Sequence, residues 1–385
     1  MEKVYIKNIS EYDLNNLKRI IRETFKELDI KINKNAKVLV KPNFLLAKPQ
    51  DSSVITNPIF IRAVLEVLLE LKTKPFIYEI PSVYSIEAAA NKCGLDKIAK
   101  ELKIEIKKQG TFQPISIDNN KYFKRLSIPK EVKEADFIIS LPKLKTHSFM
   151  GLTLGVKNTF GLVKFDFRTS MHFKAGRDRD YFANVLIDVH NAIKPNLTIL
   201  DGIIGMEGNG PSNGKSRNFN FVAGSKNAFA LDAAVIGILK KKQDEIPIQK
   251  AAVSRKIFGS NIKDVTVKGD KINITNPIRM PDSFTHSSNN LVNLAIQFSF
   301  PLVSRLVQSR PKMIHSKCIS CFNCKRICPA KAISINNKNK PVIDYKKCVR
   351  CFCCHEVCPA NAIEIDKTFI RKIMEKRTEK KLKGM

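Results

Sequence analysis

Strand-like and helix-like patterns of hydrophobic positions alternate along the first 280 residues. Short apolar runs typical of buried strands occur at residues 38–40, 76–80, 137–141 and 197–200. Segments with helical spacing of apolar residues occur at 14–28, 59–71, 85–92, 181–193 and 227–241. Asn57 and Pro58 supply an N-cap and a first-turn proline for the second of these. The alternation predicts an α/β domain over residues 1–280, with a mostly parallel sheet and helices on both faces.

The remaining chain divides into three shorter regions. An apolar stretch at 291–308 is interrupted by polar residues and by Pro301, so it is too polar to span a bilayer. Its polar residues recur at helical spacing, which predicts a linker with an amphipathic helix at 281–310. A small, separate α+β domain is expected at 311–367, followed by a basic tail at 368–385.

Composition narrows the class of protein. The 385 residues include 67 Lys and Arg against 36 Asp and Glu, for a net charge of +31, and 43% are hydrophobic, which excludes a disordered or fibrous chain. The first ten residues lack a secretory pattern, so a reducing cytoplasmic location is expected. The positive charge favours an acidic protein partner or an anionic small molecule. Nucleic acid is disfavoured as a partner, because the lysines are scattered and no nucleic-acid motif is present.

Nine of the ten cysteines lie between Cys318 and Cys358. The pattern Cys-x-x-Cys-x-x-Cys-x-x-x-Cys-Pro begins at Cys318 and is repeated thirty residues later from Cys348. In this pattern three thiolates bind one cubane and the fourth is carried to the other, so two [4Fe-4S] clusters with crossed ligands are predicted. The predicted ligands are Cys318, Cys321, Cys324 and Cys358 for cluster 1, and Cys348, Cys351, Cys354 and Cys328 for cluster 2.

Zinc is the alternative occupant of eight thiolates, but zinc sites favour separated Cys-x-x-Cys pairs. Cys353 lies outside the repeat, and a small buried apolar role is expected for it, with a stand-in ligand or redox switch as the alternative. His355 is expected to be a neighbour that tunes the cluster or an exposed side chain. The segments 332–335 and 362–365, which follow each Cys-Pro, are expected to pair as short strands over the clusters.

Polar residues follow the predicted strands of the α/β domain. In parallel sheets ligands bind beyond the carboxyl ends of the strands. We therefore predict a crevice there, in which a charged loop at 143–158 holds an anion such as a carboxylate or phosphate. The candidate binding residues are Lys41, Asn43, Lys143, Lys145, Lys157 and Asn158, with His147 as proton donor on the ground that an imidazole pKa can lie near neutrality.

Residues 201–214 hold five of the sixteen glycines. A phosphate-binding P-loop at 209–216 is disfavoured, because Asn209 replaces the first glycine and residues 219–222 alternate like a strand. Asp201, Glu207 and Asp232 could hold a divalent metal ion, and capping or turn roles are equally compatible with their positions.

Three segments carry a family resemblance. VLVKPNFLLAK at 38–48, SLPKLKTHSFMGLTLGVKNTFGLV at 140–163 and ILDGIIGMEGNGPSNGK at 199–215 resemble the family called domain of unknown function 362. The cysteine-rich region resembles a bacterial-type two-cluster ferredoxin, a module to which members of that family are often fused. The resemblance implies an uncharacterised iron–sulfur protein and no particular mechanism.

These observations favour a ferredoxin-linked redox protein, in which two clusters carry electrons to or from an anionic substrate or cofactor in the crevice. One alternative is a non-catalytic electron carrier or docking protein for a redox partner. The other is a basic iron–sulfur protein that binds nucleic acid.

Overall fold

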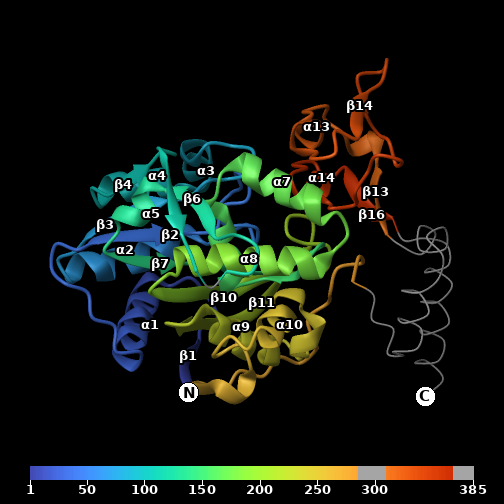
Figure 1. Cartoon of the computed structure of the whole chain (residues 1–385). Helices are drawn as coiled ribbons and strands as arrows, with labels where there is room; N and C mark the ends of the chain where they lie inside the picture. Colours follow the sequence, from blue (N-terminus) through green and yellow to red (C-terminus); the bar gives the residue numbers. More distant parts are fainter. Residues whose placement is uncertain (119, 285–308, 367–385) are drawn as a thin grey trace.

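A computed structural model describes residues 1–118, 120–284 and 309–366 (Figure 1). Its ten-stranded sheet has the order β12-β1-β11-β10-β7-β2-β3-β4, and β8 joins it at β10 and carries β9. Six of the strand pairs are parallel: β1–β12, β10–β7, β10–β8, β2–β3, β2–β7 and β3–β4. The strands are β1 (Glu2–Asn8), β2 (Lys37–Lys41), β3 (Lys74–Tyr78), β4 (Glu105–Lys107), β7 (Phe137–Ser140), β8 (Lys143–His147), β9 (Gly151–Thr153), β10 (Leu197–Glu207), β11 (Lys215–Ser225) and β12 (Val265–Gly269).

Helices cover both faces of this sheet. One face carries α1 (Leu14–Glu27), α2 (Pro58–Glu70), α3 (Ile86–Cys93) and α4 (Leu95–Glu101), and the other carries α8 (Arg179–Ile193), α9 (Ala228–Ile238) and α10 (Pro247–Ser254). Successive side chains of a strand point to opposite faces. In β2, Val38 and Val40 accordingly pack into the first core and Leu39 into the second. The prediction of a mostly parallel sheet with two covered faces is confirmed.

Local signals in the sequence fix several boundaries. The side chain of Asn57 accepts a hydrogen bond of 2.8 Å from the backbone N–H of Ile59, and Pro58 opens α2, as predicted. The alternating residues 219–222 lie within β11, so no helix follows the glycine-rich segment and a P-loop is excluded. The shorter elements are β5 (Phe112–Ser116), β6 (Arg125–Pro129), α5 (Lys130–Glu134), α6 (Gly155–Asn158) and α7 (Phe165–Ala175), and 3₁₀ turns lie at Thr159–Leu162, Gln243–Glu245, Ile262–Asp264 and His315–Lys317.

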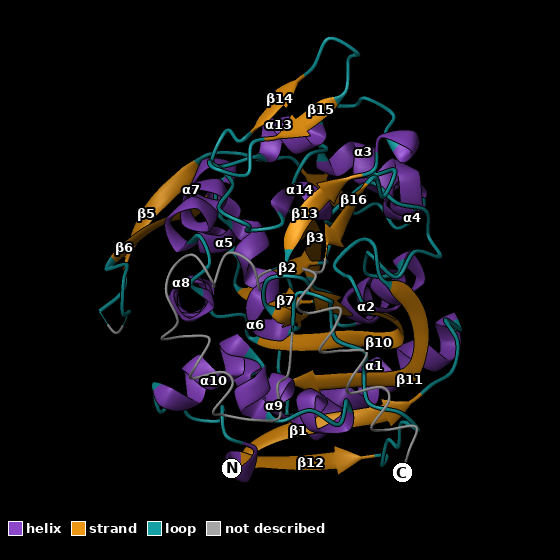
Figure 2. Cartoon of the chain, turned by 90° about the vertical axis from the view of Figure 1, so that its right-hand side faces the viewer, coloured by secondary structure: helices purple, strands orange, loops and turns teal. Residues whose placement is uncertain are grey.

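The cysteine-rich module lies beside α3 and α7 (Figures 1 and 2). It contains two short helices, α13 (Asn323–Ile327) and α14 (Cys353–Glu356), and four short strands, β13 (Arg310–Met313), β14 (Ile333–Ile335), β15 (Pro341–Ile343) and β16 (Ile363–Asp366). The expected pairing between the two segments that follow Cys-Pro is wrong: β14 pairs with β15, and β16 pairs with β13. The two segments therefore belong to two separate two-stranded sheets of the module.

The predicted amphipathic helix of the linker and the basic tail fall on residues 285–308 and 367–385, which lie outside the described residues. The bounds of the four predicted regions stay predictions. Among the described residues, no helix is long and apolar enough to cross a membrane.

Candidate functional site: a cavity between the α/β domain and the cysteine-rich module

The floor of the cavity is built where β2 and β3 end. Lys41 is the last residue of β2, and its ammonium pairs with the carboxylate of Glu79, which follows β3; both side chains are buried. Asn43 donates a hydrogen bond of 2.9 Å from Nδ2 to Oδ1 of Asn158. The Asn158 amide in turn donates to Oγ of Ser140 at the end of β7, over 2.9 Å. These contacts hold three of the predicted residues together at the carboxyl edge of the sheet.

The segment from Lys143 to His147 is a buried strand, β8, and not the charged loop that was expected. It adds to β10 on one side and β9 on the other, so its backbone is paired and its polar side chains must be satisfied inside the protein. Lys145 does this by donating to Oδ1 of Asn43 over 2.7 Å and to the carbonyl of Val54 over 2.6 Å.

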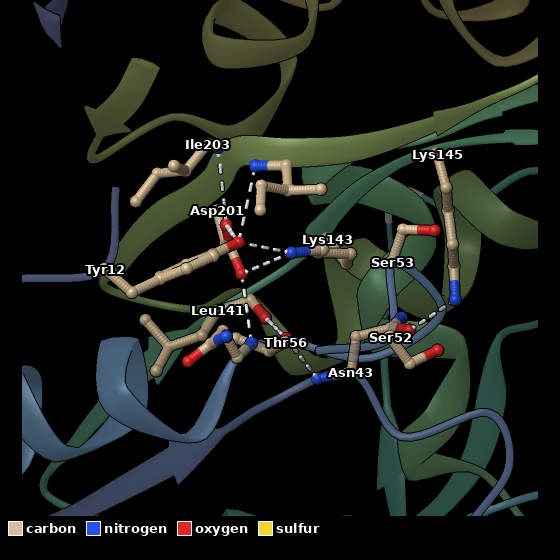
Figure 3. A network of polar contacts seen from close by, with 12 residues as sticks. Tyr12, Asn43, Ser52, Ser53, Thr56, Leu141, Lys143, Lys145, Asp201 and Ile203 are labelled. Atoms are coloured by element: carbon tan, nitrogen blue, oxygen red, sulfur yellow. Dashed lines mark hydrogen bonds and ion pairs between the residues drawn. The ribbon is translucent and has the colours of Figure 1, made fainter. Parts of the chain in front are cut away.

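Lys143 does not line the cavity. Its Nζ donates to Oδ2 of Asp201 and to the hydroxyl of Tyr12, each over 2.7 Å, and the Tyr12 hydroxyl donates to Oδ1 of Asp201 over 2.8 Å (Figure 3). The backbone N–H of Asn57, at the start of α2, also donates to Oδ2 of Asp201, over 3.0 Å. Burial lowers the pKa of Lys143, and the Asp201 carboxylate opposes that shift. The Lys143–Asp201 ion pair is therefore structural, and its network joins β8 and β10 to the segment before α1 and to the start of α2.

Six predicted residues line one cavity, about 790 Å³ of space that is partly open to solvent: Lys41, Asn43, Lys145, His147, Lys157 and Asn158. Residues that the sequence did not single out complete the α/β side of the wall. Among them, Arg168 on α7 donates to the carbonyl of Ile80 over 3.0 Å, and His172 lies one turn further along α7. Phe160 and Phe165 add apolar surface, so the cavity combines cations, amides and aromatic rings.

The lysines in this cavity have depressed pKa values. Burial lowers the pKa of Lys145 to about 7, and the charge of Lys157 contributes to the shift. Burial also lowers the pKa of Lys157, against the attraction of Glu356. Among the described residues, no hydrogen bond or ion pair is found for the Lys157 ammonium. A positively charged group without a partner in a concave site is a feature of anion-binding sites.

His147 differs from the expectation in one respect. Burial and the charge of Lys157 lower its pKa well below the ordinary value, so a pKa near neutrality is wrong for this imidazole. Its Nδ1 accepts hydrogen bonds from the backbone N–H groups of Phe149 (3.0 Å) and Met150 (3.2 Å). The single proton of the neutral ring is therefore on Nε2, which faces the cavity and lies 3.1 Å from Oε1 of Glu356.

The cysteine-rich module forms the opposite wall. Ile327 from α13 and Cys353, Glu356 and Val357 from α14 and its end line the same cavity. Burial raises the pKa of the Glu356 carboxyl to about 7, while Lys157 and Lys145 act against this rise. The sequence did not point to Glu356. A comparison of the two halves of the cysteine repeat would have done so, because Glu356 stands where the first half has Arg326, and Cys353 where it has Asn323.

Contacts of α14 hold the two walls together. Oγ of Ser212 donates to the carbonyl of Glu356 over 2.7 Å. His355 is buried, and its ring nitrogens lie 2.6 Å from the carbonyl oxygen of Ile363 and 3.1 Å from that of Asn209. His355 is thus a contact between the module and the α/β domain, and it is not exposed.

Two further cavities lie inside the module, and each is lined by four cysteines. Cys318, Cys321, Cys324 and Cys358 line one of about 320 Å³, and Cys328, Cys348, Cys351 and Cys354 line the other, of about 330 Å³. Nevertheless, within the described part of the chain no three Cys, His, Asp or Glu side chains are close enough to share one metal ion. The four cysteines around each cavity are the ligand set that one cubane requires.

Backbone donors complete these two sulfur sites. The N–H groups of Ala332 and Ala362 each donate to a cysteine sulfur, Sγ of Cys328 and of Cys358, over 3.2 Å. Such hydrogen bonds help set the reduction potential of iron–sulfur clusters. The residues present at each of these two sites therefore fit a [4Fe-4S] cluster.

The three acidic residues considered for a divalent metal serve other purposes. Asp201 belongs to the network with Lys143, and Glu207 pairs with Arg217 at 2.8 Å. Asp232 accepts hydrogen bonds from the backbone N–H groups of Gly155 (2.7 Å) and Val156 (3.1 Å) at the start of α6. Ion pairing and capping therefore account for all three.

The fold and the site define an iron–sulfur electron-transfer protein whose α/β domain shares a cavity with a cysteine-rich module. Residues 317–376 match the family described as 4Fe-4S dicluster domain, which establishes 4Fe-4S binding. Residues 38–237 match the family described as Domain of unknown function (DUF362), and because this match covers more than half of the chain, the chain belongs to that family.

Among known proteins, the Thylakoid-associated protein sll1697 of Synechocystis sp. is 36% identical over 216 residues, which are 56% of this chain and 66% of that protein. The match thus spans just under two thirds of that relative. Among solved structures, the lactate racemase apoprotein from Thermoanaerobacterium thermosaccharolyticum has a TM-score of 0.39 and 14% identity, over 61% of this chain and 56% of that one.

Proposed function

We propose that this protein carries electrons, one at a time, between two [4Fe-4S] clusters and an anionic substrate or cofactor held in the cavity. The observation that supports it is that cations of the α/β domain and side chains of the iron–sulfur module line the same cavity. The clusters, in the crossed cysteine sets given above, would supply one-electron chemistry when bound. A partner protein would exchange these electrons with the module.

The ligand is proposed to be an anion because positive charge dominates the α/β side of the cavity. Lys41 is neutralised by Glu79, but Lys157 and Arg168 have no carboxylate partner in the described part of the chain, and Lys145 is held only by neutral oxygens. An anion would compensate these charges within a partly desolvated site, where charge-assisted hydrogen bonds are strong. His147 would donate its Nε2 proton to the ligand in a hydrogen bond.

The position of cluster 2 supports electron transfer into this cavity. Its ligand Cys351 packs in a small apolar cluster with Cys353, Val357 and Ile327, and those three side chains also line the cavity. The predicted ligand loop thus packs against side chains that line the cavity, which would keep the transfer distance to a bound anion short.

Replacement of Lys157 tests the proposal. We expect anaerobically purified wild-type protein to release a small anion on denaturation, detected by mass spectrometry, and Lys157→Met protein to release at least about tenfold less, since a charge-assisted contact is worth about 1.5–3 kcal/mol. Lys174→Met is the matched control, because Lys174 is exposed on α7. If all three proteins release the same molecules in the same amounts, the cavity does not bind the ligand and the function reduces to electron carriage alone.

Binding of an anion should also depend on pH through Lys145. Because its pKa lies at about 7, Lys145 is charged below that pH and becomes neutral above it. With sulfate as the probe, whose charge is constant from pH 6 to 9, we expect the dissociation constant to rise above pH 7 by up to about tenfold per pH unit. Isothermal titration calorimetry measures this dissociation constant at each pH. Lys145→Met should weaken this dependence, and the part that persists should be lost in Lys145→Met with Glu356→Gln, because the Glu356 carboxyl on the facing wall also has a pKa of about 7. A dependence unchanged by Lys145→Met would contradict the prediction.

A further inference from the structure

The two cysteine loops of the module differ in exposure. In the first loop Cys321 is exposed, and Ile319 beside it is 65% exposed. Their equivalents thirty residues later are Cys351, which is 6% exposed, and Val349, which is half-buried. The second loop is covered because it packs on the α/β domain. The first loop is therefore the part of the iron–sulfur module that an external protein can reach.

Positive charge surrounds the first loop. The segment 313–343 contains six Lys and Arg and no Asp or Glu. Lys340 donates from Nζ to the carbonyl of Cys318 over 2.7 Å, and the hydroxyl of Ser320 donates to the carbonyl of Asn339 over 2.9 Å, so the turn that carries Lys338 lies against this loop. Lys325 and Lys338 are exposed and have no ion pair within the described ranges.

Apolar side chains accompany these charges. Besides Ile319, Ile335 and Val342 are more than one third exposed, and both lie on the β14–β15 hairpin. Figures 1 and 2 show this hairpin projecting away from the large sheet. Exposed apolar groups with a charged rim are typical of surfaces that bind another protein.

We propose that this basic face, defined as Ile319, Cys321, Lys325, Lys338 and Lys340, docks a small acidic electron-carrier protein. Charge complementarity selects such a partner, because its acidic rim would meet the lysines while its cofactor approaches the exposed first loop. One electron passes between carrier and module, so that one is oxidised as the other is reduced, and no covalent bond forms. Electrons would then pass between the module and the cavity through the second cysteine loop, which packs on the α/β domain.

The test uses the full iron-loaded chain and a purified acidic two-cluster ferredoxin as the probe. We expect Lys325→Glu with Lys338→Glu to weaken equilibrium binding about tenfold or more at low salt, and to slow electron exchange measured by stopped flow by a similar factor. In addition, raising the salt concentration should weaken wild-type binding more than binding of the variant. Lys263→Glu with Lys268→Glu is the matched control, since both lysines are exposed next to or on β12, at the opposite end of the molecule from β14 (Figure 2).

Equal binding by wild type and the Lys325/Lys338 variant would overturn the proposal. The proposal would also be overturned if the wild-type protein did not bind the ferredoxin but bound single-stranded DNA or anionic vesicles through these lysines, because the face would then bind a polyanion. If the charge reversal lowers iron content, Lys325→Gln with Lys338→Gln replaces it. Lys157→Met should bind the ferredoxin normally, so failure here and failure of the cavity proposal are separate results.

Discussion

Replacing Cys358 with Ala should remove the same cluster as replacing Cys324, although 34 positions separate them in the sequence. Each single variant should lose about four of about eight irons per chain, because Cys358 completes the set begun by Cys318. The double variant Cys324→Ala with Cys358→Ala should lose no more iron than either single variant. Cys324→Ala with Cys328→Ala should lose both clusters. Iron and acid-labile sulfide, with electron paramagnetic resonance of the reduced protein, provide the measurement.

The crossed arrangement is contradicted if Cys324→Ala and Cys328→Ala together cost only about four irons, because these two cysteines would then share a cluster. Cys353→Ala serves as the control: Cys353 lies outside both sulfur cavities and should keep the full iron content. Where one empty site unfolds the module, reconstitution with iron and sulfide under anaerobic conditions separates lost ligation from lost folding.

Asp201→Ala is expected to destabilise the α/β domain by about 3–5 kcal/mol, because it leaves the Lys143 ammonium buried without its carboxylate. Asp201 and Lys143 are 0% and 1% exposed, so water cannot replace the missing partner. Urea unfolding followed by far-ultraviolet circular dichroism should show the loss as a lower midpoint. Replacing both partners, as Lys143→Met with Asp201→Leu, should restore part of the stability, since no buried charge remains although the Tyr12 hydroxyl and the Asn57 N–H lose their acceptor.

The matched control is an exposed ion pair of the same domain. Lys130 and Glu134 are about half exposed and lie 3.2 Å apart, so Glu134→Gln should change the unfolding free energy by less than about 0.5 kcal/mol. If Asp201→Ala also lowered the unfolding free energy by less than about 0.5 kcal/mol, the buried pair of Lys143 and Asp201 would not be essential for stability.

Secondary structure and metal chemistry could be predicted where the signal is local. The N-cap at Asn57 and the apolar runs at β2 and β7 depend on neighbours within a few residues, and the cysteine spacing depends on the loop that wraps a cluster. By contrast, the sequence pattern predicts a loop at β8, because the lysines of this segment are polar. Its burial depends on Asp201 and Asn43, which are distant in sequence, and no local pattern reveals such partners.

The candidate site was predicted in part, for a related reason. The strand-end rule brings Lys41, Lys145 and Lys157 to one edge of the sheet without knowledge of the contacts. However, Glu356 lies in another module, and its place in the cavity depends on how the two parts of the chain dock. The environment of His147 likewise depends on burial by both parts, so its low pKa was not foreseeable from the residue type.

The shared wall has a consequence for damage by oxygen. Ile327, Cys353, Glu356 and Val357 belong to or directly follow α13 and α14, the short helices that also carry the predicted cluster ligands Cys324 and Cys354. A molecule that has lost its iron through oxidation would lose this side of the cavity as well as its electron relay. Loss of the clusters would therefore disable electron transfer and the proposed anion cavity together.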